Sequence, residues 1–255
     1  MSIDSVFNYP MLILALSFSA LWLSTWVGAS ILRKKRNLED DVRDDFNTIL
    51  MSTLTLNGLI IGFSFSMAIS RYDQRKNYEE AEANAIGTEY VRADLLPPAD
   101  AARVRELLGK YLDQRVSFYT TRDEHQLGQI DASTAQLQAE LWSAVRAAAA
   151  GQPTYMVALA VSGMNDVLNS EGYTQAAWWN RIPLAAWVLM AALAICCSLL
   201  LGYDARETDA LLFLVLPLVV SISFFLIAEI DSPRAGVIRV LPQNLGRLYP
   251  TLHAH

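Results

Sequence analysis

The chain has few of the residues that carry chemistry in enzymes and metalloproteins. Its 255 residues include two cysteines and three histidines, and only 18% are charged. The cysteines, Cys196 and Cys197, are adjacent in sequence and cannot supply a disulfide framework or a four-ligand zinc site. No histidine lies near an apparent nucleophile, and no glycine-rich phosphate loop is present. We therefore expect a protein that is not an enzyme, with no catalytic site, no metal site and no cofactor.

Positive charge is also scarce, since 20 Lys and Arg residues face 26 Asp and Glu residues, a net charge of −6. Proteins that bind nucleic acid use basic surfaces to neutralise phosphates. Nucleic acid is therefore excluded as an expected partner. What the chain has in excess is apolar residues, at 53%, and their distribution indicates the class.

Four long stretches without any charged residue predict membrane spans. They are residues 10–32, 47–70, 182–203 and 210–228. A helix of about 20 residues is long enough to cross a hydrocarbon core of about 30 Å. A basic run follows the first stretch instead of preceding it, so we expect this span to be retained as an anchor in the lipid bilayer. The basic run consists of Arg33, Lys34, Lys35 and Arg36.

Between the second and third spans, apolar residues recur at helical spacing, and strand alternation is not evident. The sequence thus predicts an all-α integral membrane protein with four transmembrane helices and a helical soluble block. The predicted domains are residues 1–70, with the first two membrane helices; 71–181, the soluble block; 182–228, the third and fourth membrane helices; and 229–255, a C-terminal tail that packs on the block.

The second span is predicted to continue as one helix from residue 47 to about residue 95, because no proline or obvious cap interrupts it. Its acidic run of Glu79, Glu80 and Glu82 could be a cation site. These side chains are expected to point in three directions on a helix, and this favours a solvated face.

Small residues recur every fourth position in the second span, and apolar residues follow a neighbouring ridge. Such a small-residue stripe lets another helix approach closely in lipid. Two interpretations are open: packing within one subunit, which the pattern alone favours, or the wall of a pore. The stripe comprises Gly58, Gly62, Ser66 and Ser70, and the ridge comprises Thr55, Leu59, Phe63 and Met67.

Charged residues flank the spans on one side of the membrane. Arg71 follows the second span, Arg181 precedes the third, and Glu229 and Asp231 follow the fourth. We expect ion pairs among them that fix the register of three helices. The alternative is that headgroups and water satisfy these charges.

The pair Gly62 and Phe63, followed eight residues after Phe63 by Arg71 and Tyr72, resembles the pore-lining second helix of the bestrophins. The segment 227–236, with its acidic residues, proline and glycine, is similar to the bestrophin stretch after the last membrane helix. From residue 55 to residue 245 the chain is identified as a member of the bacterial bestrophin-like domain family.

The resemblance implies a homo-oligomer, a pentamer of four-span subunits in the bacterial inner membrane, with a central pore for small inorganic ions. Its neck would fall on Thr55, Leu59 and Phe63, with Ser66 and Ser70 beyond it, and anions such as chloride are the expected ions. Thr55 departs from the apolar pattern of the family's neck. The dense acidic calcium cluster of animal bestrophins is absent after Pro233.

A second hypothesis is a non-conducting membrane scaffold or sensor whose helical block binds a partner; it predicts that the small-residue stripe packs within one subunit. Orientation is also open. The short basic first loop places the soluble block outside, whereas the resemblance places it in the cytoplasm.

Overall fold

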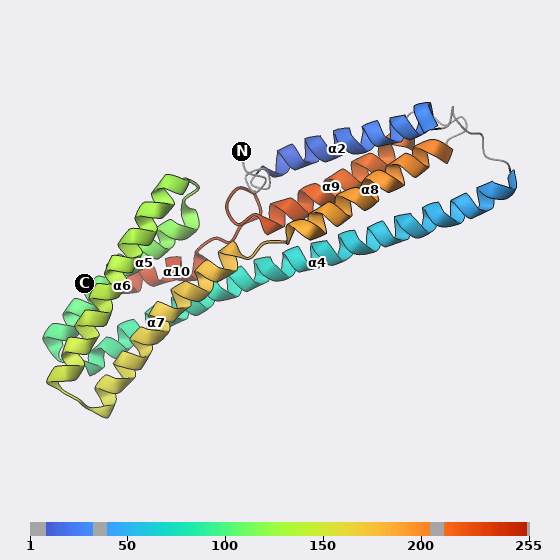
Figure 1. The fold of residues 1–255 in the computed structure, drawn as a ribbon. Coiled ribbons are helices and arrows are strands. Elements are labelled where there is room, and N and C mark those ends of the chain that lie inside the picture. The colour runs from blue at the N-terminus through green and yellow to red at the C-terminus, as the bar shows by residue number, and fades with distance from the viewer. Residues whose placement is uncertain (1–8, 33–39, 205–211, 254–255) are drawn as a thin grey trace. The chain divides into compact units, whose positions relative to one another are not determined.

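The computed structural model describes residues 9–32, 40–204 and 212–253, and every regular element in these ranges is helical (Figure 1). The predicted all-α class is confirmed. Four helices are long and apolar enough to cross a membrane, as the uncharged stretches predict. The basic run Arg33 to Arg36 lies outside the described residues.

The first membrane helix, α2 (Pro10–Val27), begins at a proline, whose missing N–H costs nothing in the first helical turn. It continues as a π-helical turn, η1 (Gly28–Leu32). The third and fourth membrane helices are α8 (Leu184–Asp204) and α9 (Leu212–Asp231).

The second membrane helix is part of α4 (Asp40–Arg92), which has 53 residues and is therefore about 80 Å long. A short 3₁₀ turn, η2 (Ala93–Leu95), follows it. The predicted continuous helix to about residue 95 is thus confirmed. The uncharged part of α4, residues 47–70, is the membrane-crossing segment, and charged residues of the same helix lie on both sides of it.

The chain divides into two compact units. The first comprises residues 1–71 and 181–239, and the second comprises residues 72–180 and 240–255. The C-terminal residues from 229 are therefore divided between the units, because the bends at 233–238 belong to the first unit and α10 (Gln243–Leu252) belongs to the second.

In the first unit, α2 packs on α8 and α9, and η1 packs on α8. Two glycines lie where these helices come into close contact. A Cβ atom added to Gly202 would overlap the carbonyl oxygen of Thr25, and one added to Gly28 would overlap that of Leu199. Backbones therefore touch directly at this crossing, the arrangement that small residues allow between helices in lipid.

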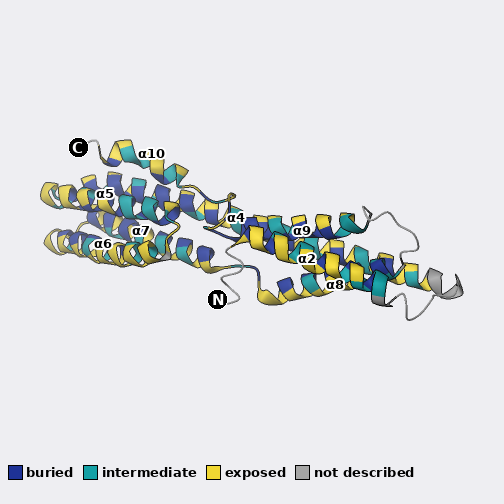
Figure 2. Ribbon diagram, turned by 90° about the horizontal axis from the view of Figure 1, so that it is seen from above, coloured by how far each residue is buried: buried dark blue, intermediate teal, exposed yellow. Residues whose placement is uncertain are grey.

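In the second unit, α5 (Pro98–Thr120), α6 (Glu124–Gly151) and α7 (Tyr155–Trp179) enclose an apolar core together with the second part of α4. Helix starts are set by local bonds, since Asp123 accepts the His125 N–H and Thr154 accepts the Val157 N–H. Buried faces appear as dark blue bands along these helices (Figure 2). In this unit, the largest fully buried apolar side chains are Ile86, Leu108, Tyr111, Leu112, Leu141, Met164 and Leu245.

Candidate functional site

One side of α4 in the first unit is exposed along the whole membrane-crossing segment. The predicted neck residues Leu59 and Phe63 are 51% and 62% exposed. Thr55, Ser66 and Ser70, the other predicted pore residues, are exposed as well. The opposite side of the helix is buried at Asn57, Ser64 and Ala68. The five predicted residues therefore share one face, as spacings of three and four residues require.

The glycines of the small-residue stripe are open in this chain. A Cβ atom added to Gly58 or to Gly62 would meet no other atom of the described residues within 4 Å. The interpretation that these two glycines pack against a helix of the same subunit does not fit this geometry. In contrast, Gly28 and Gly202 in the same unit show what such a packed glycine looks like.

The exposed face of α4 differs in chemistry from the exposed faces of the third and fourth membrane helices, α8 and α9. On α8 and α9 the large exposed side chains are aliphatic, as expected for surfaces against lipid. On α4, hydroxyl groups and glycines alternate with Leu59 and Phe63. A mixed face of this kind is typical of contact with protein or water. The large exposed residues of α8 and α9 are Leu184, Val188, Leu189, Ile195, Val215, Leu218, Val219, Ile222 and Leu226.

Thr55, the polar member of the predicted neck, has its hydroxyl engaged. Its Oγ1 donates a hydrogen bond to the Met51 carbonyl oxygen, 2.8 Å away. This bond occupies the only proton of the hydroxyl group. The position is therefore less polar than its residue type suggests.

In the second unit, α4 continues to expose one polar side. With about 3.6 residues per turn, the five exposed residues that make up this side lie in the same register as Thr55 and Ser66. Two of the five side chains are carboxylates. The exposed residues are Asp73, Asn77, Glu80, Asn84 and Thr88.

The two carboxylates after the fourth span are buried, at 5% exposure for Glu229 and 6% for Asp231. Asp231 accepts the Ile182 N–H through both oxygens, at 3.1 and 3.3 Å. Glu229 accepts the Val237 N–H at 2.7 Å, and a Cβ atom on Gly236 would overlap the same carboxylate. The acids thus hold the turn before α8 and the bends after α9.

The predicted ion pairing of these acids with Arg71 and Arg181 stays a prediction. What the sequence pattern did not indicate is that both carboxylates accept hydrogen bonds from backbone N–H groups, which stabilise a buried negative charge. The Arg71 side chain bonds to the Met67 sulfur at 3.5 Å.

The prediction that the acidic run of α4 forms a solvated face is wrong. Glu80 is exposed, but Glu79 is 1% exposed and Glu82 is 0% exposed. Residues three apart on a helix lie on the same side, so both face the interior of the second unit. The expectation that the three side chains diverge overlooked this.

Glu82 lies at the centre of a buried polar cluster. Its Oε1 binds Arg115, which is also fully buried, and its Oε2 accepts hydrogen bonds from Tyr119 and Thr174, both at 3.1 Å. Arg115 Nη1 also lies 3.7 Å from Glu171. Burial, with the Glu82 charge beside it, raises the pKa of the Tyr119 hydroxyl above its ordinary value.

Glu79 caps the C-terminal helix. Its Oε1 accepts the N–H groups of Asn244 and Leu245 at 2.9 and 3.0 Å, and its Oε2 accepts the Asn244 side-chain amide at 2.7 Å. The free N–H groups of a helix start attract an anion. This carboxylate therefore fastens α10 to α4 within the second unit.

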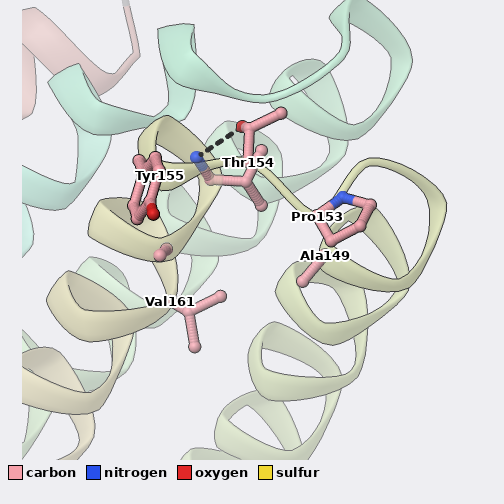
Figure 3. A pocket seen from close by; sticks show the side chains of 7 residues that line it. Ala149, Pro153, Thr154, Tyr155 and Val161 are labelled. Carbon is pink, nitrogen blue, oxygen red and sulfur yellow. Dashed lines mark hydrogen bonds between the residues drawn. The ribbon is translucent and has the colours of Figure 1, made fainter.

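A pocket of 740 Å³ lies at the α6–α7 corner (Figure 3). Its lining is mainly aliphatic, and Thr154 already caps α7 through its hydroxyl. No group of three or more potential metal-ligating side chains occurs in the part of the chain that the structure describes. The exposed face of α4 is therefore the best candidate site.

These features define a four-span helical membrane protein with a second helical unit built on a continuation of its second membrane helix. The chain belongs to the Bestrophin-like family, whose domain matches residues 14–245. The predicted family membership is confirmed.

Among solved structures, bacterial bestrophin homologues from Klebsiella pneumoniae have the same fold. A single-substitution variant superimposes with a TM-score of 0.67 at 13% identity, covering 96% of this chain and 99% of that one. A structure phased with zinc gives 0.65 at 14% identity, covering 96% and 97%. No curated protein matches the chain in sequence.

Proposed function

We propose that copies of this chain assemble, as a pentamer, around an axis lined by the exposed face of α4 and form an ion channel in the bacterial inner membrane. The observation that carries the proposal is the mixed character of this face. Leu59 and Phe63 are more than half exposed, and open glycines and hydroxyl groups lie between them. Membership of a family known for channels supports it.

A ring of Leu59 and Phe63 side chains would form an apolar constriction, which can close by excluding water. The edges of phenyl rings are electropositive, so a ring of Phe63 edges tolerates a partly dehydrated anion. Ser66 and Ser70 would offer hydroxyl groups next to this neck. Chloride is therefore the first candidate ion.

A second candidate, cations, is favoured by a specific observation. Asp73 and Glu80 are exposed on α4 beyond the membrane-crossing segment. Rings of carboxylates at a pore mouth concentrate cations and repel anions. The neck thus predicts selectivity for anions, whereas the exposed carboxylates predict selectivity for cations. A measured reversal potential distinguishes the two.

The test is planar-bilayer recording of the purified oligomer in a salt gradient, with the Leu59→Ala, Phe63→Ala variant beside the wild type. We expect a higher conductance in the variant because the neck is wider. Leu189→Ala is the matched control, since Leu189 is 47% exposed on α8 and its loss should leave the current unchanged. An unchanged current in the assembled double variant would remove this face from the pore. Silence of the assembled wild type would favour a scaffold or sensor that binds a partner protein.

A further inference from the structure

Glu89, in the second unit, is a buried carboxylate for which the proposed channel gives no role. It lies on α4 outside the membrane-crossing segment and is 0% exposed. Neither of its oxygens has a hydrogen-bond partner among the described residues. The other buried acids of this helix, Glu79 and Glu82, are each held by several donors.

The space for this carboxylate is made by a glycine of α7. A Cβ atom added to Gly163 would overlap Glu89 Oε2 and clash with Arg92 Nη1. Gly163 is itself buried. The carboxylate therefore lies directly against the α7 backbone, in space that a side chain at position 163 would fill.

The charges that act on Glu89 come from both helices. Arg92 on α4 favours the ionised form, and Asp166 on α7 disfavours it. Asp94 of the adjoining η2 turn is paired with Arg105 of α5. Burial outweighs Arg92 and raises the pKa of Glu89 to about 8, since a carboxylate without donors is poorly solvated in a protein interior.

A bound metal ion is a poorer explanation of this site. Glu89 belongs to no group of three potential ligands among the described residues, and the Arg92 guanidinium occupies the space next to its oxygen. A proton is the one cation that a single buried carboxylate holds without further ligands.

We propose that Glu89 is a proton-binding switch: the protonated acid packs against Gly163, and its ionisation loosens the contact between α4 and α7. Thr88 and Val91, on either side of it in sequence, are on the exposed side of α4. Loosening this contact therefore shifts exposed residues of the same helix, and alkaline pH changes conduction. Only this last step rests on the proposed function.

The direction of the pH effect follows from the two states. The unfolded chain loses this proton near pH 4.5, and the folded chain loses it near pH 8. Stability from the protonated acid is therefore complete below about pH 4.5, declines between these values, and is gone above about 8. In the folded protein, about nine-tenths of the Glu89 side chains are protonated at pH 7 and about one-tenth at pH 9.

The first test needs no current. Infrared difference spectra of the assembled protein between pH 6 and pH 9 should show loss of a protonated carboxyl band in the wild type. The band should be absent in Glu89→Gln, whose neutral amide imitates the protonated acid, and present in the control Glu80→Gln, an exposed acid of the same helix. Thermal unfolding should show a melting temperature that falls between pH 5 and pH 8 in the wild type and in Glu80→Gln, and falls less in Glu89→Gln. A wild type without the band, or equal pH slopes in all three proteins, would overturn the switch.

The second test measures current between pH 7 and pH 9. We expect at least a twofold change in the wild type that Glu89→Gln abolishes. A pH-independent current in a wild type with a titrating Glu89 would overturn the coupling to conduction. Absence of any current while the band titrates would refute the channel and leave the proton site established, so the two failures are distinguishable.

Discussion

The buried pair of Arg115 and Glu82 allows the effect of one substitution to be worked out from the structure. Both side chains are 0% exposed. In Arg115→Met, Glu82 keeps the hydroxyl groups of Tyr119 and Thr174 but loses the Arg115 guanidinium that binds it. Breaking a buried pair by removing one partner costs about 3–5 kcal/mol. For a chain of this size, about 2–4 °C per kcal/mol gives a fall in melting temperature of about 6–20 °C.

The assay is thermal unfolding of the oligomer in detergent, followed by the helical circular dichroism signal. Lys110→Met is the control, because Lys110 pairs with Glu106 on the surface and exposed pairs contribute about 0–1 kcal/mol. The double variant Glu82→Met, Arg115→Met should recover much of the loss, since it leaves no buried charge from this pair. Equal effects of Arg115→Met and Lys110→Met would refute the reasoning.

Two further predictions concern close contacts. Gly202→Ala should lower the free energy of unfolding, measured by urea titration, by about 1–3 kcal/mol, because its methyl group would overlap the Thr25 carbonyl. The control Gly128→Ala, at an open helical position, should be neutral or stabilising. Equal effects of the two substitutions would contradict the close approach at Gly202. Glu79→Gln should cost about 1–3 kcal/mol, because an amide group would face the Asn244 donors; limited proteolysis should then cleave α10 faster than in the wild type, and unchanged cleavage would rule out this cap.

The membrane helices and the length of α4 could be predicted from the sequence because they depend on local features. Absence of charge over residues 47–70 and absence of proline up to residue 95 are visible in one segment of chain. The common face of Leu59, Phe63 and Ser66 also follows from helical periodicity alone. The exposure of this face does not follow from periodicity, because whether a neighbouring helix covers a face depends on the whole packing arrangement.

The buried acids could not be predicted because their partners are distant in sequence. Glu82 meets Arg115 and Thr174, which are 33 and 92 positions away, and Glu79 meets Asn244 after 165 positions. Local polarity alone therefore favoured a position at the protein surface for these acids. A signal was present nevertheless: Glu79, Glu82, Ile86 and Glu89 follow one another at spacings of three and four, the periodicity of a buried helical face.

Three acids on the buried side of α4 are accommodated in three different ways. Glu79 accepts N–H groups at the start of α10, and Glu82 binds a buried guanidinium. Glu89 has no donor among the described residues, so protonation is what lets it remain buried. The contact of Glu89 differs from these two attachments because its carboxyl group has a pKa raised to about 8. Of the contacts that hold this part of α4, the one at Glu89 is therefore the place where a small change in conditions can alter the helix that carries the candidate conduction face.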